Sequence, residues 1–95
     1  MHCQKLKRIG KLLPPYYEIA DFLWGVEADI DSDGNSENPD SLDWDELTLI
    51  LRSNPEHRID IDPDPNDDGL LIVKSEVEEL LLNTIEFLKS KKVVV

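Results

Sequence analysis

Mostly apolar residues recur at helical spacing near the C-terminal end of the chain. The stripe consists of Val77, Leu80, Leu81, Thr84, Ile85 and Leu88. Because residues three and four positions apart share one face of a helix, this stripe predicts an amphipathic helix. Ser75 is a suitable N-cap, and Glu78 three residues later completes a capping box, so the helix is expected to begin at this serine.

Two more helices are predicted nearer the N-terminus. Over about residues 16–27 the apolar positions again have helical spacing, and they are Ile19, Phe22, Leu23 and Val26. A shorter helix is expected over residues 4–13, with its apolar side chains facing inward. It should end at Pro14 and Pro15, because a proline disfavours helical geometry in the residue that precedes it.

Strand patterns occupy the middle of the chain. Residues 58–62 alternate polar and apolar side chains, as a half-buried strand does, and an Asn-Pro turn signal at 54–55 precedes them. Residues 70–73 form a short apolar run, and residues 42–52 fit either a helix or a strand, of which the following turn favours a strand. These elements predict one α+β domain over residues 1–95. Its small antiparallel sheet of about three strands would pack with N- and C-terminal helices.

Two acidic segments begin in the way that calcium loops begin. Residues 29–34 read Asp-Ile-Asp-Ser-Asp-Gly and residues 64–69 read Asp-Pro-Asn-Asp-Asp-Gly, and their first residues are 35 positions apart. Each has oxygen-bearing side chains at positions 1, 3 and 5 and a glycine at position 6, an order that folds oxygen atoms around one hard cation. We therefore expect Ca²⁺ to bind in acidic loops at about residues 29–41 and 62–69. The candidate ligands are Asp29, Asp31, Asp33, Asn35, Glu37 and Asp40 in the first cluster, and Asp60, Asp62, Asp64, Asn66 and Asp68 in the second.

Neither segment matches an EF-hand loop over its full length. In the first, the closing position is Asp40 rather than a glutamate, and Ser36 stands where an aliphatic residue should pair with a partner loop. In the second, Ser75 falls at the closing position, and Pro63 and Pro65 stand where the entering helix should end. A degenerate, all-α EF-hand pair is therefore the alternative fold. The α+β domain with two calcium-type oxygen clusters agrees better with the strand patterns.

The charge of the chain narrows its functional classes. It has 21 Asp and Glu residues against 10 Lys and Arg residues, and its formal net charge is −11. This charge disfavours nucleic acids and anionic membranes, and it favours a cation or a basic protein as partner. The chain begins without the apolar stretch of a signal peptide and contains no apolar run long enough to span a bilayer, so we expect a cytoplasmic protein.

The sequence offers no constellation for catalysis. His2 is close to the terminus, and His57 lies in a predicted turn beside Glu56, so neither histidine is placed as a general base. No nucleophile can be matched with a nearby base, and there is no glycine-rich phosphate loop. We therefore expect that the protein is not an enzyme. We also expect a monomer.

In overall character, the chain resembles the small acidic calcium-binding proteins of cyanobacteria typified by CcbP. The likeness lies in the strong acidity, the calcium-type segments at residues 29–40 and 60–68 and the terminal amphipathic helix. Because no specific motif is shared, no individual ligand is carried over. The resemblance implies an intracellular protein that sequesters calcium.

A second functional hypothesis is an acidic inhibitor or immunity-type protein that covers a basic site on a partner. Composition supports it as well as it supports calcium binding. The spacing of the two segments favours calcium, because a cation needs convergent oxygens whereas a basic surface can be met by any acidic patch. The chain has only one methionine, Met1, and this favours a calcium buffer over a sensor with a Met-rich groove.

Overall fold

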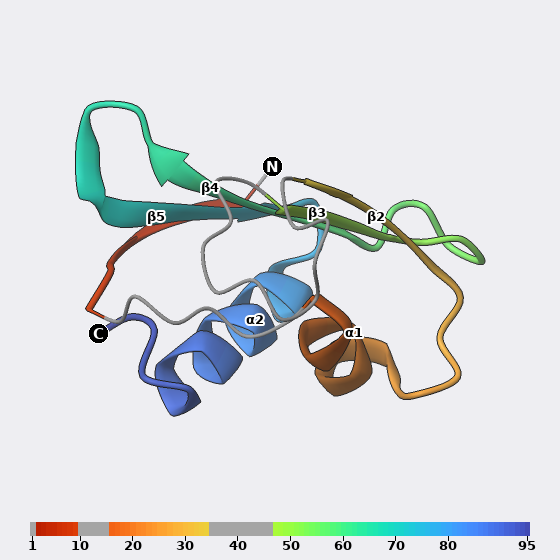
Figure 1. The fold of residues 1–95 in the computed structure, drawn as a ribbon. Helices are drawn as coiled ribbons and strands as arrows, with labels where there is room; N and C mark the ends of the chain where they lie inside the picture. Colours follow the sequence, from red (N-terminus) through yellow and green to blue (C-terminus); the bar gives the residue numbers. More distant parts are fainter. Residues whose placement is uncertain (1, 10–15, 35–46) are drawn as a thin grey trace.

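The computed structural model describes residues 2–9, 16–34 and 47–95, and at 33, 34 and 68 it describes the backbone alone. The elements in chain order are β1 (His2–Lys7), α1 (Tyr16–Trp24), β2 (Ile30–Gly34), β3 (Leu47–Leu51), β4 (Arg58–Asp64), β5 (Asp67–Ser75) and α2 (Glu78–Ser90). The strands form one sheet in the order β1-β5-β4-β3-β2, and every neighbouring pair is antiparallel. Both helices lie on the same side of this sheet, so the described part of the chain is a two-layer α+β domain (Figure 1).

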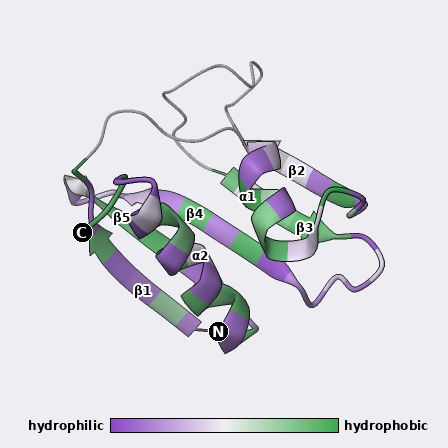
Figure 2. Cartoon of the chain, turned by 90° about the horizontal axis from the view of Figure 1, so that it is seen from below, coloured by the Kyte–Doolittle hydropathy of each residue, from purple (hydrophilic) through white to green (hydrophobic). Residues whose placement is uncertain are grey.

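The hydrophobic core lies between the sheet and the two helices. Alternate residues of each strand point to the helix side, because successive side chains of a strand lie on opposite faces. Among the described residues, the apolar side chains with no exposed surface are Ile19, Leu49, Ile59, Ile61, Val73, Leu88 and Val93. Figure 2 looks onto the helix side and shows hydrophobic and hydrophilic positions alternating along β4. No described helix covers the other side of the sheet, which is called the open face below.

The expected sheet of about three strands is wrong, because the described residues form five strands. Residues 2–7, which overlap the helix expected over 4–13, form β1 and pair along the edge of β5, with Leu6 opposite Leu71. Leu6 is the one buried residue of β1, so the strand needs little apolar patterning of its own. Its hydrogen-bonding partner, not its local sequence, makes this segment extended. Residues 10–15 lie outside the described part.

The first acidic segment also departs from the expected loop. Residues 30–34 form β2 and pair with β3 in the register Ile30 opposite Leu51 and Gly34 opposite Leu47. The strand reading of the ambiguous stretch is confirmed for residues 47–51. The all-α alternative is wrong, because β2, β3 and β4 are extended segments. Their backbone hydrogen bonds run between antiparallel strands and not within helices.

The helix predicted over about residues 16–27 is confirmed, but it ends at Trp24. Gly25 follows with φ +98°, and its N–H donates to the carbonyl of Asp21 at 2.8 Å. Glycine adopts this left-handed conformation without a steric penalty, and it closes the helix as a C-terminal cap. Helix α1 has 9 residues and α2 has 13, and no helix in the described ranges is long and apolar enough to cross a membrane.

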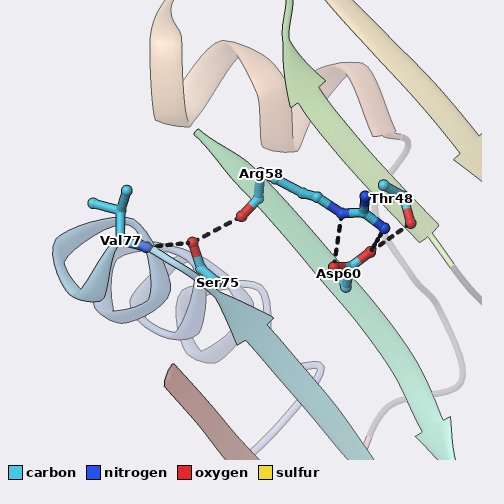
Figure 3. Close-up of polar contacts among 5 residues, drawn as sticks. All are labelled: Thr48, Arg58, Asp60, Ser75 and Val77. Carbon is cyan, nitrogen blue, oxygen red and sulfur yellow. Dashed lines mark hydrogen bonds and ion pairs between the residues drawn. The ribbon is translucent and has the colours of Figure 1, made fainter. Parts of the chain in front are cut away.

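The C-terminal helix is confirmed, but its predicted capping box is wrong. Helix α2 begins at Glu78, and its N-cap is Val77, which makes no side-chain capping bond. Ser75 is the last residue of β5, where its hydroxyl donates to the carbonyl of Arg58 at 2.7 Å and accepts from the N–H of Val77 at 3.1 Å (Figure 3). The serine therefore joins β4 to the chain entering α2 rather than capping the first helical turn.

Candidate functional site

Arg52 occupies the space between the first two candidate ligands. Its Nε donates to Asp31 Oδ1 at 2.8 Å, and its Nη1 donates to Asp29 Oδ1 at 2.9 Å. The register explains this contact, because Ile30 lies opposite Leu51 and Arg52 is the next residue along the chain. The hydrogen bond that Arg52 donates to Asp31, and after it the negative charge of Asp29, raise the pKa of the guanidinium. The positive charge between these two carboxylates is therefore the guanidinium of Arg52.

The rest of the first cluster is described only in part. The backbone of Asp33 lies opposite Thr48 on β3. Asn35, Glu37 and Asp40 lie outside the described residues. Gly34 and Leu47, the described residues on either side of positions 35–46, are paired with each other.

The second acidic segment is a β-hairpin, with Asp64 and Asp67 paired on either side of a two-residue turn. Asp64 is buried at 4% exposure, and its Oδ1 accepts from the N–H of Asn66 at 2.8 Å while its Oδ2 lies 3.2 Å from Lys5 Nζ. The bond from Asn66, and after it the contact with Lys5, lowers the pKa of this carboxyl. Asp67 Oδ1 accepts from the N–H of Gly69 at 2.9 Å.

The bonds from the N–H of Asn66 to Asp64 and from the N–H of Gly69 to Asp67 are Asx turns, in which an aspartate carboxylate accepts from the backbone N–H two residues later. The same short spacing that suggests a calcium loop also allows each carboxylate to satisfy its own backbone. Asn66 is exposed in the turn, and the side chain of Asp68 is not described. The structure therefore does not gather the residues of this segment around a common point.

Asp60 and Asp62 lie on the open face of β4. Asp60 accepts from Arg58 Nε at 3.0 Å and Nη2 at 3.1 Å, and from the hydroxyl of Thr48 at 2.7 Å (Figure 3). Asp62 is half-buried. Burial raises the pKa of Asp62 and the charge of Asp60 adds to this, while Lys74 and Arg58 oppose it. The positive charges of Lys74 and Arg58 thus only partly offset the cost of ionising Asp62.

The pairing of three strands relates the end of β2 to the aspartates of β4. Leu47 is paired with Gly34 on one side and with Ile61 on the other, and Ile61 stands between Asp60 and Asp62. Leu47 therefore lies on the strand next to these two carboxylates, and Gly34 lies one strand further away. We call this place, defined by Asp60, Asp62 and the paired ends Gly34 and Leu47, the acidic corner. Neighbouring strands are about 4.8 Å apart, so β2 and β4 lie about 10 Å from each other here.

Within the described residues, no group of three or more His, Cys, Asp or Glu side chains is arranged to hold a metal ion. The carboxylates of Asp29, Asp31, Asp60, Asp64 and Asp67 contact arginine, lysine, a threonine hydroxyl or backbone N–H groups. Sequence reasoning missed Arg52 and Arg58, which flank the turn between β3 and β4. The signal available was their position: Arg52 directly follows β3, whose partner β2 carries Asp31, and Arg58 stands two residues before Asp60 on β4.

Comparison with known proteins adds no family or fold relative. The chain matches no protein-family model, and neither curated proteins nor solved structures give a significant match. These comparisons therefore do not link the chain to the cyanobacterial calcium-binding proteins, and the resemblance stays an expectation from the sequence.

Proposed function

We propose that this protein binds one Ca²⁺ ion at the acidic corner and acts as a cytoplasmic calcium buffer. The observation that supports the proposal is the register Gly34–Leu47–Ile61, which places Leu47 on the strand next to Asp60 and Asp62 and Gly34 one strand further away. The sequence alone predicts two sites 35 positions apart. The sheet supports one composite site instead.

Asp62 is the central ligand in this proposal. Its carboxylate is half-buried next to the negative charge of Asp60, and both effects raise its pKa. A bound cation would reverse the sign of the local field, which favours the ionised form that coordinates Ca²⁺. Calcium takes six to eight oxygens, so the remaining ligands must come from elsewhere. From the sequence we assign Glu37 and Asp40 to this role, together with water.

Three of the candidate ligands, Asp29, Asp31 and Asp64, have structural roles in this proposal. Asp29 and Asp31 hold Arg52, so calcium would have to displace a charged guanidinium to reach them. Asp64 holds a backbone N–H and Lys5, and Asp67, beside the candidate Asp68, holds the N–H of Gly69. Asn66 lies in the same turn. These groups stabilise the sheet end and the hairpin instead of coordinating the ion.

A buffer agrees better with this fold than a sensor. The apolar side of α2 is already part of the core, with Leu80, Leu81, Ile85 and Leu88 at most 5% exposed. A sensor needs an apolar surface that calcium uncovers. Here binding would order the acidic corner and leave the packing of the helices unchanged. We further propose that the protein is a monomer without enzymatic activity.

A calorimetric titration with Ca²⁺ at physiological salt tests the proposal. We expect one equivalent of Ca²⁺ to bind, with Mg²⁺ much weaker, and Asp62→Asn to weaken binding by at least about tenfold. Asp67→Asn is the matched control, because it removes one charge from the same hairpin but keeps an oxygen that accepts from Gly69. It should change the affinity by less than about twofold.

Two results would contradict the calcium proposal. If both variants weakened binding equally, the ion would respond to net charge and not to a defined site. If no heat were observed with Ca²⁺, the second hypothesis, an acidic protein that covers a basic partner, would take its place. The open face, which no described helix covers and on which Asp60 and Asp62 lie, is the surface that such a partner would meet.

A further inference from the structure

The outer edge of β1 is covered at one end by the last residues of the chain. Arg8, which directly follows β1, lies opposite Val94 in an antiparallel bridge. In this bridge the N–H of Val95 donates to the carbonyl of Lys7 at 3.0 Å. Figure 2 shows β1 at the rim of the sheet, with the C-terminus beside one of its ends. This edge therefore already holds one short antiparallel segment.

The rest of the edge, residues 2–6, has no strand partner on its outer side among the described residues. Backbone N–H and C=O groups point alternately to the two sides of a strand. The N–H of Arg8 donates to a carbonyl of β5, whereas the carbonyl of Lys7 faces the C-terminal segment. By this alternation the backbone groups of Cys3 and Lys5 point away from β5, and both residues are exposed. Such an edge can pair with a further strand.

The open-face side of this edge carries positive charge. Lys5 and Lys7 project to the open face, because Leu6 between them is buried on the helix side. Lys74, which stands between two buried residues of β5, projects to the same face. Lys5 contacts Asp64 and still keeps 57% of its side chain exposed. A strand added here would therefore meet lysine side chains, although the net charge of the chain is −11.

We propose that residues 2–6 of β1 bind an extended, acidic segment of a partner protein as an added antiparallel strand. Its main chain bonds to the outward N–H and C=O groups of Cys3 and Lys5. An Asp or Glu opposite Lys5 also lies diagonal to Lys7, within reach of both charges. A second copy of this chain is disfavoured, because pairing over the same residues brings the Lys5 side chains of both copies to opposite or diagonal positions, where like charges repel.

The probe is the capped peptide acetyl-Thr-Glu-Val-Glu-Val-Thr-amide, titrated into the ¹⁵N-labelled full chain at physiological salt with EDTA present. The EDTA makes the result independent of calcium binding at the acidic corner. We expect saturable shifts of the Cys3 and Lys5 amide resonances, and slower exchange of these two N–H groups with solvent in the bound state. The same peptide with Gln in place of both Glu residues should bind about two- to fivefold more weakly, the effect of one exposed charge pair.

Cys3→Pro tests the main-chain bond, because proline removes the outward N–H and is tolerated in edge strands where that N–H faces solvent. It should weaken binding of the Glu peptide by about three- to tenfold, as expected for one lost hydrogen bond. Cys3→Ser is the matched control, since it keeps the N–H and should bind as the unaltered chain does. Lys5→Gln, which also keeps the N–H, should weaken the Glu peptide by about two- to fivefold and leave the Gln peptide unchanged.

Four outcomes would overturn the proposal. The Glu peptide causes no saturable shift of the Cys3 and Lys5 resonances, or the Glu and Gln peptides bind equally well. Cys3→Pro binds the Glu peptide as tightly as Cys3→Ser does. Finally, the same two resonances shift when the protein is concentrated without any peptide, because a second copy would then occupy the edge.

Discussion

The two acidic segments share one order of residues but have different structures. Asp29 and Asp31 are exposed at the edge of the sheet, with 68% and 59% of their side chains accessible, and they hold Arg52 across the strand pair. Asp64 is 4% exposed and holds the backbone of its own turn together with Lys5. The order of residues therefore fixes where oxygens lie along the chain. The neighbouring strands decide whether those oxygens are available to a cation.

The largest expected difference between the segments is in stability. Asp64→Ala leaves the N–H of Asn66 and the ammonium of Lys5 without this buried carboxylate, so we expect the melting temperature to fall by about 5 °C or more. Asp29→Ala removes an exposed ion pair and should lower it by less than about 2 °C. Thermal unfolding followed by circular dichroism measures both. Equal decreases in melting temperature would mean that the burial of Asp64 does not make it more important for stability than the exposed Asp29.

Asp62 and Asp64 should have opposite effects on the pH dependence of stability. The lowered pKa of Asp64 contributes stability above the unfolded value of about 3.9, and this is lost as pH falls through the lower, folded value. The raised pKa of Asp62 has the opposite sign: its ionisation destabilises the fold once pH exceeds the unfolded value.

Without calcium, Asp62→Asn should therefore raise the melting temperature at pH 7, and the gain should vanish below about pH 4. Asp64→Asn should lower it at pH 7 and flatten the loss of stability on acidification. Melting curves of both variants between pH 3 and 7 check these signs. A destabilising Asp62→Asn at pH 7 would show that its charge is fully compensated in the folded protein.

The smallest expected effect is that of Arg52→Gln. The arginine is exposed, so its loss should shift the melting temperature by less than about 2 °C. It should also leave the calcium stoichiometry at one, because Asp29 and Asp31 alone offer too few oxygens for Ca²⁺. The titration used for Asp62→Asn serves here too. A second equivalent of bound calcium would show that Arg52 substitutes for an ion in a true calcium loop.

The sequence by itself determined the elements with strong internal periodicity. Both helices were predictable, since each buries an apolar stripe at helical spacing, as Ile19 and Leu88 show. The strand over residues 58–62 was predictable from its alternation, because Ile59 and Ile61 face the core while Asp60 and Asp62 do not. In each case one element contains enough apolar residues to indicate which of its sides is buried.

Only the tertiary structure decided the remaining strands and the grouping of the acidic residues. Segments β1 and β2 are edge strands, and their extended form depends on hydrogen bonds to β5 and β3 that no local pattern records. The same pairing places the end of β2 two strands away from Asp60 and Asp62 on β4, and the single candidate site is proposed from this arrangement. Such contacts depend on register, and register is a property of strand pairs rather than of single segments.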